Sequence, residues 1–297
     1  MGTGVLVYFP TNLGDAILCL PSLDRVKHAY PNSKITGLVS PKTAHLFSRN
    51  NFLNEIKEFD KKWPVSKKLR FSLANRGKYH TVIDFKNSLL PIILNAKKRT
   101  PFIRNYSKNI LAKDIYLDLV KNLTTNNASL KSDFTVTTEE KNKFQEIAPN
   151  SLFITCASRS HFKSYEYNCL YKTVKELSFA YSVVILGEKC DRKYYRDILN
   201  INGVVDLVGK TSMPEVFYLI KNYAKLLFCV DSSILHIASY LNVATVVIFG
   251  PTNSQKYGPS SQNSILLKGT NTDKGVVIDS KQTIEAIRNL WTHLKKY

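Results

Sequence analysis

Residues 226–252 read LLFCVDSSILHIASYLNVATVVIFGPT and contain two apolar runs separated by about one helix length. The runs Leu226–Val230 and Thr245–Phe249 are apolar on both faces, as strands buried in a parallel sheet are. The segment between them predicts a helix that runs to Leu241, so the three elements form a βαβ unit. Ligands of such sheets bind outside the carboxyl ends of the strands, which directs attention to the residues that follow each run.

The same alternation of strands and helices extends over the whole chain of 297 residues and predicts an α/β fold. Ser212 and Glu215 have the spacing of a capping box, and Asp279 with Gln282 begins a C-terminal amphipathic helix. Six further strands are expected at Val5–Phe9, Ile35–Val39, Val82–Phe85, Leu152–Cys156, Val183–Gly187 and Val204–Val208.

The composition changes between Thr124 and Asn150, where the chain becomes polar before a new strand begins. This change predicts a domain boundary. We expect two Rossmann-like domains, residues 1–148 and residues 149–297, each with helices on a parallel sheet. The chain length suits two domains of ordinary size.

The chain is strongly basic, with 42 Lys and Arg against 23 Asp and Glu and a net charge of +19. Residues 1–125 hold 21 basic and 8 acidic side chains, and Lys97-Lys98-Arg99 is one of the basic clusters. The expected partners are anionic: nucleic acid, a membrane surface or a phosphorylated substrate. A solvated basic surface and a nucleic-acid-binding protein are both alternatives, although no RNP, KH, helix-turn-helix or zinc-finger pattern is present.

The five cysteines form no CxxC pair, which favours a reducing, cytoplasmic setting without structural zinc. No apolar run reaches the roughly 20 residues that span a bilayer. No basic segment precedes the first strand, so we expect no signal peptide.

The turn Thr11-Asn12-Leu13-Gly14-Asp15 directly follows the first strand. Gly14 permits a tight turn into a helix that begins near Asp15, and the helix dipole favours an ionised carboxylate there. Asp15 is therefore a candidate general base facing a ligand, and a helix-capping Asp is the alternative. The pattern GxGxxG is absent, so the turn is not a dinucleotide fingerprint.

Two stretches of the second half have the residue types of a phosphate site. Asp231, Ser232, Ser233 and His236 follow a strand, where the amides of a helix start and small hydroxyls suit a diphosphate. The alternative is an Asp that caps the helix and a partly buried His. The segment from Cys156 to Lys163, which contains Ser158, likewise follows a strand and ends on a mobile positive charge.

Together these stretches resemble the family 9 glycosyltransferases, the lipopolysaccharide heptosyltransferases. The opening PTNLGDAILCLPSL resembles the family's S/T-x-x-G-D turn and L-P-x-L helix, and KYHTVIDFK resembles its Y-D-x-V-I-D strand. CASRSHFK resembles its G-A-x…K segment, and LVGKTSMPEVF its G-K-T-S-L helix start. The most specific likeness is VDSSILHIASYLNVATVVIFGPT, which is similar to the D-T-G-x-x-H-x-A-A…F-G-P-T signature.

The resemblance implies a GT-B fold, with two Rossmann-like domains and an active site in the cleft between them. It implies an inverting glycosyltransferase that needs no metal ion or cofactor and moves a heptose from an ADP-sugar to a lipopolysaccharide inner-core acceptor. The enzyme would be cytoplasmic and peripherally bound to the inner membrane, with no nucleic-acid partner. A divergent transferase that uses another nucleotide sugar is the alternative.

The resemblance also assigns roles to residues. By motif position, Asp15 is the catalytic base, and Lys163 contributes the positive charge beside the diphosphate in place of a metal ion. The expected nucleotide-sugar site comprises Ser158, Lys163, Asp231, Ser232, Ser233 and His236. From the basic charge of residues 1–125 and the turn after the first strand, the expected acceptor site comprises Thr11, Asn12, Lys97, Lys98 and Arg99. The sequence departs from the family pattern at Ser233, where the family usually has Gly, and at Ser164-Tyr165-Glu166, where it has Arg-Trp-Pro.

Overall fold

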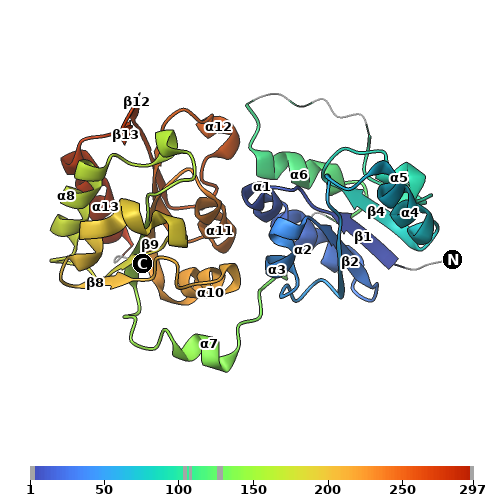
Figure 1. Cartoon of the computed structure of the whole chain (residues 1–297), viewed down its shortest axis with the longest axis horizontal. Coiled ribbons are helices and arrows are strands. Elements are labelled where there is room, and N and C mark those ends of the chain that lie inside the picture. The colour runs from blue at the N-terminus through green and yellow to red at the C-terminus, as the bar shows by residue number, and fades with distance from the viewer. Residues whose placement is uncertain (1–3, 103–105, 107–108, 126–129, 295–297) are drawn as a thin grey trace. The chain divides into compact units, whose positions relative to one another are not determined.

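A computed structural model of the chain describes residues 4–102, 106, 109–125 and 130–294 (Figure 1). The chain divides into two compact units, Met1–Thr135 and Val136–Tyr297. The expected boundary after residue 148 lies further along the chain than this division. The intervening segment contains helix α7 (Thr138–Asn142), and the Lys143 ammonium beside it pairs with the Glu215 carboxylate of the second unit at 3.1 Å.

The first unit contains one sheet of five parallel strands: β1 (Gly4–Tyr8), β2 (Ile35–Val39), β3 (Glu55–Glu58), β4 (Tyr79–Asp84) and β5 (Lys98–Arg99). The strands lie in the order β3-β2-β1-β4-β5. The chain therefore builds outward from β1 in one direction and then returns to build from its other side. This is the order of a Rossmann-type sheet, and the carboxyl ends of β1 and β4 mark its topological switch point.

Helices cover both faces of this sheet. They are α1 (Leu13–Leu18), α2 (Leu20–Ala29), α3 (Pro41–Phe47), α4 (Val65–Asn75), α5 (Leu90–Ile93) and α6 (Ala112–Val120). Leu6 and Leu90 lie in one buried cluster with α5, whereas the ring of Phe9 stacks on that of Phe47 in α3 with centroids 4.3 Å apart. Leu6 and Phe9 are an odd number of residues apart, and such side chains point to opposite faces of a strand. Helices α5 and α3 therefore cover opposite faces of the sheet.

The second unit repeats this plan with six parallel strands: β6 (Ser151–Thr155), β7 (Val183–Ile185), β8 (Val204–Asp206), β9 (Ala224–Val230), β10 (Ala244–Phe249) and β11 (Ser264–Lys268). Their order is β11-β10-β9-β6-β7-β8, so the switch point lies between β6 and β9. An antiparallel hairpin, β12 (Thr270–Thr272) and β13 (Gly275–Val277), follows the sheet.

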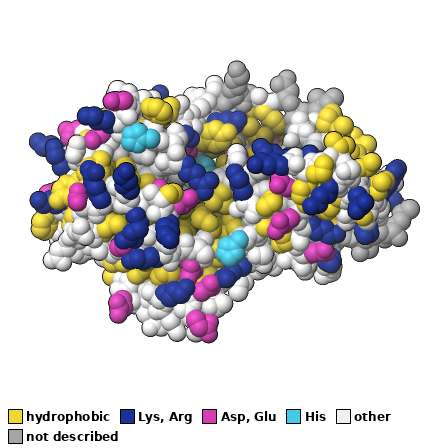
Figure 2. Space-filling model, viewed as in Figure 1, with side chains coloured by type: hydrophobic (Ala, Val, Ile, Leu, Met, Phe, Trp, Pro, Cys, Tyr) yellow, Lys and Arg dark blue, Asp and Glu magenta, His cyan; other side chains and the backbone are white. Residues whose placement is uncertain are grey.

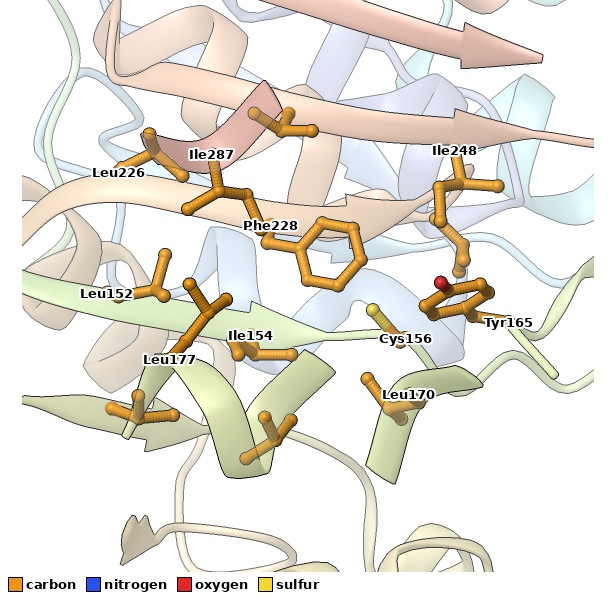
Figure 3. Packing of buried hydrophobic residues seen from close by; sticks show 14 of the residues in the cluster. Leu152, Ile154, Cys156, Tyr165, Leu170, Leu177, Leu226, Phe228, Ile248 and Ile287 are labelled. Carbon is orange, nitrogen blue, oxygen red and sulfur yellow. The ribbon is translucent and has the colours of Figure 1, made fainter. Parts of the chain in front are cut away.

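The long helices of the second unit lie on two sides of its sheet (Figure 1). They are α8 (Tyr167–Leu177) and α13 (Ser280–His293) on one side, and α10 (Met213–Tyr223) and α11 (Ser233–Leu241) on the other. Shorter helices connect the strands: η1 (His161–Lys163), η2 (Lys189–Asp191), α9 (Arg192–Tyr195), η3 (Arg196–Asn200) and α12 (Ser254–Tyr257). Figure 3 shows the core beneath α8 and α13, where Ile154, Phe228, Leu177 and Ile287 point toward one another.

The structure confirms all eight strands expected from apolar runs and both expected helix starts. The Ser212–Glu215 capping box begins α10, and the Asp279 carboxylate accepts the Lys281 amide at 3.1 Å at the start of α13. The sequence did not predict β3, β5, β11 or the hairpin. β3 reads EIKE and is an edge strand that pairs only with β2. It therefore lacks the apolar run that is typical of a central strand.

Candidate functional site

The loops after β6 and β9 meet at the switch point of the second sheet. β6 and β9 are hydrogen-bonded neighbours, and their paired residues run to Thr155 and Cys229 at the carboxyl ends. The loop of residues 156–163 follows β6, and residues 231–233 follow β9. Both sequence-predicted stretches of the second unit therefore lie at the edge where sheets of this order bind ligands.

Lys163 and Asp231 form an ion pair across these two loops. The Lys163 ammonium donates to the Asp231 carboxylate at 2.7 Å, with the Lys163 side chain 33% exposed and that of Asp231 10% exposed. This corrects the alternative that Asp231 caps α11. Ser232 is the N-cap residue, and its side chain makes no capping hydrogen bond.

Two buried polar atoms near this ion pair have no hydrogen-bond partner among the described residues. They are the Ser232 Oγ, at the start of α11, and the His236 Nδ1, one turn further along. His236 is only 6% exposed. Buried polar atoms nearly always form hydrogen bonds with protein or water. Two such atoms without a partner, one helical turn apart, therefore indicate a site for a bound group.

The imidazole of His236 is uncharged at neutral pH. Burial lowers the pKa of His236 to about 4, the Lys163 ammonium lowers it further, and the Asp231 carboxylate opposes both. A neutral imidazole presents one donor and one acceptor nitrogen, so it binds a polar ligand without adding charge. The positive charge of this site therefore comes from Lys163. The ring of Tyr257 lies near His236, with centroids 6.5 Å apart.

Asp15 lies in the first turn of α1, at the carboxyl end of β1. Asn12 is the N-cap residue of α1, and its side-chain amide donates to the Asp15 carboxylate at 3.4 Å. The Ser40 hydroxyl donates to the Thr11 carbonyl at 3.1 Å and so ties this turn to the end of β2. The structure thus brings Thr11, Asn12 and Asp15 together at the switch point of the first sheet, and Asp15 is not the cap of its helix.

Comparison with known proteins identifies the family. Residues 96–283, more than half of the chain, match the sequence profile of Glycosyltransferase family 9 (heptosyltransferase). The chain belongs to glycosyltransferase family 9. It is similar to lipopolysaccharide heptosyltransferase 3 of Escherichia coli, with 24% identity over 290 residues that cover 85% of both chains. It is also similar to lipooligosaccharide heptosyltransferase 2 of Campylobacter jejuni, with 26% identity over 284 residues that cover 89% of this chain and 87% of that one.

The fold of the glycosyltransferase is also that of solved structures. One is the ADP-heptose lipopolysaccharide heptosyltransferase II of E. coli, with a TM-score of 0.78 and 20% identity, where the match covers 99% of this chain and 100% of the other. The two units with parallel sheets in Rossmann order are those of the GT-B fold, as the resemblance implied.

The loop after β6 in this family 9 chain is held by a side chain that sequence analysis missed. The hydroxyl of Tyr195, which is fully buried, accepts the backbone amides of Cys156 at 2.8 Å and Ala157 at 3.0 Å. The Ser158 amide donates to the Ser164 hydroxyl at 2.9 Å. These three loop amides therefore already have hydrogen-bond acceptors within the protein. Tyr195 lies 38 residues further along the chain, so no local pattern could have identified it.

Replacing Tyr195 with Phe should destabilise the second unit of the glycosyltransferase. The ring would still fill the core, but the Cys156 and Ala157 amides would lose their acceptor. One buried donor without a partner costs about 1–3 kcal/mol, so the free energy of unfolding should fall by at least that amount. Urea unfolding followed by circular dichroism measures it, and Tyr181→Phe is the control because the Tyr181 ring packs on Trp291. Equal stability of the two variants would remove this role from the Tyr195 hydroxyl.

The departures from the family pattern at residues 164–166 have structural roles. Tyr165 is fully buried in the core shown in Figure 3, and its hydroxyl donates to the Ile278 carbonyl at 3.1 Å. The Glu166 carboxylate caps α8 by accepting the Cys169 amide at 2.9 Å. The hairpin secures the same segment, because the Val276 amide donates to the Ser164 carbonyl at 2.8 Å. Gly275, at φ +113°, belongs to this hairpin, where a side chain would collide with the Ser164 carbonyl.

The basic residues expected to bind the acceptor lie apart from the Asp15 turn. Lys98 and Arg99 form the edge strand β5 and pair with Thr81 and Val82, before the carboxyl end of β4. Lys97 precedes them, and all three are exposed. The structure therefore places them at the edge of the sheet, with β4 between them and β1.

Sequence analysis also missed a charged cluster at the first switch point of the glycosyltransferase. The Lys86 ammonium donates to the Tyr8 hydroxyl at 2.8 Å, and the Asp84 carboxylate accepts the Lys86 amide at 2.7 Å. Burial lowers the pKa of Lys86, while Asp84 raises it. Tyr8 and Asp84 end β1 and β4, and Lys86 follows β4, so strand order alone could have placed them beside the Asp15 turn once β4 was known.

Within the described residues, no three His, Cys, Asp or Glu side chains lie together as ligands for a metal ion. Of the helices in those same parts of the chain, none combines the length and the apolar character needed to cross a bilayer.

Proposed function

We propose that this family 9 glycosyltransferase moves a heptose from an ADP-sugar to an acceptor of the lipopolysaccharide inner core. The observation that carries the proposal is the group of unpaired buried atoms at the start of α11, beside the Lys163–Asp231 ion pair. This group lies at the switch point of the second sheet, where nucleotides bind in folds of this kind.

The chemistry of this group suits a nucleoside diphosphate. The first amides of α11 and the partial positive charge of its N-terminus favour an anion, and Lys163 adds a full positive charge. The Ser232 hydroxyl and the His236 imidazole supply uncharged hydrogen-bonding groups that are buried and have no partner among the described residues. A bound diphosphate would compete with the Asp231 carboxylate for the Lys163 ammonium. Ser158, on the neighbouring loop, and Ser233, the first residue of α11, complete the proposed nucleotide-sugar site.

The transfer is proposed as one displacement that inverts the anomeric carbon. The Asp15 carboxylate takes the proton of the acceptor hydroxyl as that oxygen attacks the anomeric carbon. The bond from this carbon to the diphosphate oxygen breaks, and ADP leaves with the electron pair. Lys163 and the α11 amides stabilise the charge that develops on the leaving diphosphate, so the step needs no metal ion and no covalent intermediate.

The names of the similar proteins support the donor and the acceptor class. Both curated relatives are heptosyltransferases of lipopolysaccharide or lipooligosaccharide, and the solved E. coli structure is described as an ADP-heptose enzyme. The strongly basic charge of residues 1–125 suits a phosphorylated glycolipid acceptor. We therefore include Thr11 and Asn12 beside Asp15 in the proposed acceptor site. We also include Lys97, Lys98 and Arg99 as peripheral contacts of the enzyme with an anionic membrane surface.

A nucleotide-sugar panel tests this proposal. Calorimetric titration with ADP-, UDP-, GDP- and CMP-sugars in buffer containing EDTA should show binding of the ADP-sugar above all. Transfer from ADP-heptose to a Kdo-bearing lipid A acceptor should proceed in the same buffer. Preference for another nucleotide would overturn the donor assignment, and loss of transfer that Mg²⁺ restores would overturn the metal-independent mechanism.

A further inference from the structure

Six exposed large hydrophobic side chains lie on two neighbouring helices of the first unit. Val65, Leu69 and Leu73 belong to α4, while Leu89, Ile92 and Ile93 lie on or next to α5. We call these six residues the α4–α5 surface. Among the described residues of the second unit, the exposed large hydrophobic side chains are Phe162, Phe179 and Leu266, which lie on different elements and are separated in the sequence. Exposed apolar patches of this kind mark interaction sites more often than scattered residues do.

The α4 residues form a stripe along one side of the helix. Their spacing of four residues places Val65, Leu69 and Leu73 one above another. Ser72 and Asn75 are the buried residues of this helix, and Phe71 packs against the core from the same side, whereas the stripe of Val65, Leu69 and Leu73 is exposed. The helix therefore presents a second apolar stripe to solvent, which a helix packed only on its own protein core would not do. Figure 2 shows hydrophobic side chains gathered over α4 and α5, with Lys and Arg side chains next to them.

The charge around the α4–α5 surface is predominantly positive. Residues 61–113 contain fourteen Lys and Arg and a single acidic residue, Asp84. Asp84 is buried, and its carboxylate accepts hydrogen bonds from the Lys86 and Ser88 amides. The solvent-facing side chains of this segment therefore present basic groups without carboxylates between them. A partner that covers the surface must be apolar where it contacts the stripe and negatively charged around it.

The start of α4 adds an aromatic residue of the kind found at membrane interfaces. Trp63 packs on Phe59 and Phe71, with ring centroids 5.4 and 6.2 Å away. The Lys67 ammonium lies 4.1 Å from the centre of the Trp63 ring. Tryptophan beside lysine at the end of an apolar stripe is typical of helices that lie in the plane of a lipid headgroup layer.

We propose that the α4–α5 surface inserts into the headgroup layer of an anionic bilayer and holds the first unit at the membrane. The apolar stripe would lie at the boundary of the acyl chains while the surrounding Lys and Arg contact the lipid phosphates. The inference extends the proposed function, because a glycolipid acceptor is presented at such a surface. Basic side chains far outnumber carboxylates around the contact, with Asp60 at its margin, and this favours lipid phosphate over the mixed surface of a second copy of this chain.

Vesicle co-sedimentation of the full chain without donor or acceptor tests the proposal. Wild-type protein should bind vesicles of phosphatidylglycerol and phosphatidylethanolamine and bind phosphatidylcholine vesicles weakly. The double variant Leu69→Ser/Leu73→Ser should bind the anionic vesicles about tenfold less, because two groups of the stripe are lost. The matched control is Phe179→Ser/Leu266→Ser, which removes exposed hydrophobic groups of the second unit and should bind like wild type. Circular dichroism melting verifies that each variant is folded.

A second comparison separates insertion from charge attraction. Lys97→Gln/Lys98→Gln should weaken binding at low salt more than the control Lys172→Gln/Lys175→Gln, which changes two exposed lysines of α8. At about 0.5 M salt, where surface charges are largely screened, wild type should retain binding and the Leu69→Ser/Leu73→Ser variant should lose it. Equal binding of that variant and wild type under both conditions would overturn the proposal. A dimer in solution that the same substitutions dissociate would also overturn it and assign the surface to a second copy.

The vesicle-binding result does not depend on the identity of the sugar donor. The Leu69→Ser/Leu73→Ser variant should transfer sugar to a detergent-dispersed acceptor at the wild-type rate, and lose activity only with acceptor in vesicles. If no transfer from ADP-heptose is found with wild type, the proposed function fails while the vesicle result stands. If transfer is normal and the vesicles are not bound, only the membrane inference fails.

Discussion

Asp15→Asn is expected to lower kcat by about 10²–10⁴-fold, the usual contribution of a general base. Asparagine keeps the size of the side chain and its place beside Asn12, but its amide cannot take the proton of the acceptor hydroxyl at neutral pH. The affinity for donor should change little, because the proposed nucleotide site is built from residues of the second unit. Transfer assays with saturating ADP-heptose and a Kdo-bearing acceptor measure the rate, and calorimetry with ADP measures the affinity.

Asp114→Asn is the matched control for this substitution. Asp114 lies in the first turn of α6, as Asp15 does in the first turn of α1, so both changes remove one carboxylate from a helix start. Any loss of helix-dipole stabilisation, about 0.3–1 kcal/mol, should be similar in the two variants. Only Asp15→Asn should lose activity. An Asp15→Asn enzyme within about threefold of wild type would contradict the catalytic role and leave the carboxylate a structural one.

Lys163→Ala is expected to weaken ADP binding by about 1.5–3 kcal/mol, the range for a hydrogen bond to a charged group. This corresponds to roughly 10–150-fold in Kd. The ammonium is the positive charge that the structure places beside the α11 helix start, and His236 cannot replace it because burial lowers its pKa to about 4. Isothermal titration calorimetry with ADP measures the change.

Arg159→Ala tests whether any nearby cation has this effect. Arg159 belongs to the same loop as Lys163, but its guanidinium donates to the Glu188 carboxylate at 2.8 and 3.0 Å, and both side chains are exposed. Removing it should change the Kd for ADP by no more than about twofold. Affinity loss of equal size in both variants would mean that the general basic charge attracts the nucleotide. Unchanged affinity in Lys163→Ala would remove this residue from the proposed site.

Much of the fold follows from the pattern of apolar residues. Central strands of a parallel sheet are buried on both faces, so β1, β2, β6, β9 and β10 are visible as mostly apolar runs. Helix starts are equally local, since a cap needs residues only three positions apart, as Ser212 and Glu215 are. The edge strand β3 was not predicted, because it reads EIKE and has no apolar run. The hairpin β12–β13 pairs locally but is anchored by Val276, which pairs with Tyr165 more than 100 residues earlier in the chain, and no local pattern predicts such a contact.

The candidate site likewise has features that the sequence predicts and features that only the folded chain shows. The sequence by itself determined which loops follow the strands, and therefore that Asp15, Lys163, Asp231 and His236 were candidates, because residue type and position after a strand are local properties. Only the tertiary structure decided that Lys163 pairs with Asp231, a residue 68 positions away, and that Ser232 rather than Asp231 begins α11. It also decided that His236 is buried and neutral and that Tyr195 holds the loop before Lys163. Burial and long-range pairing depend on which strands become neighbours, and strand order is a property of the folded chain that no short stretch of sequence contains.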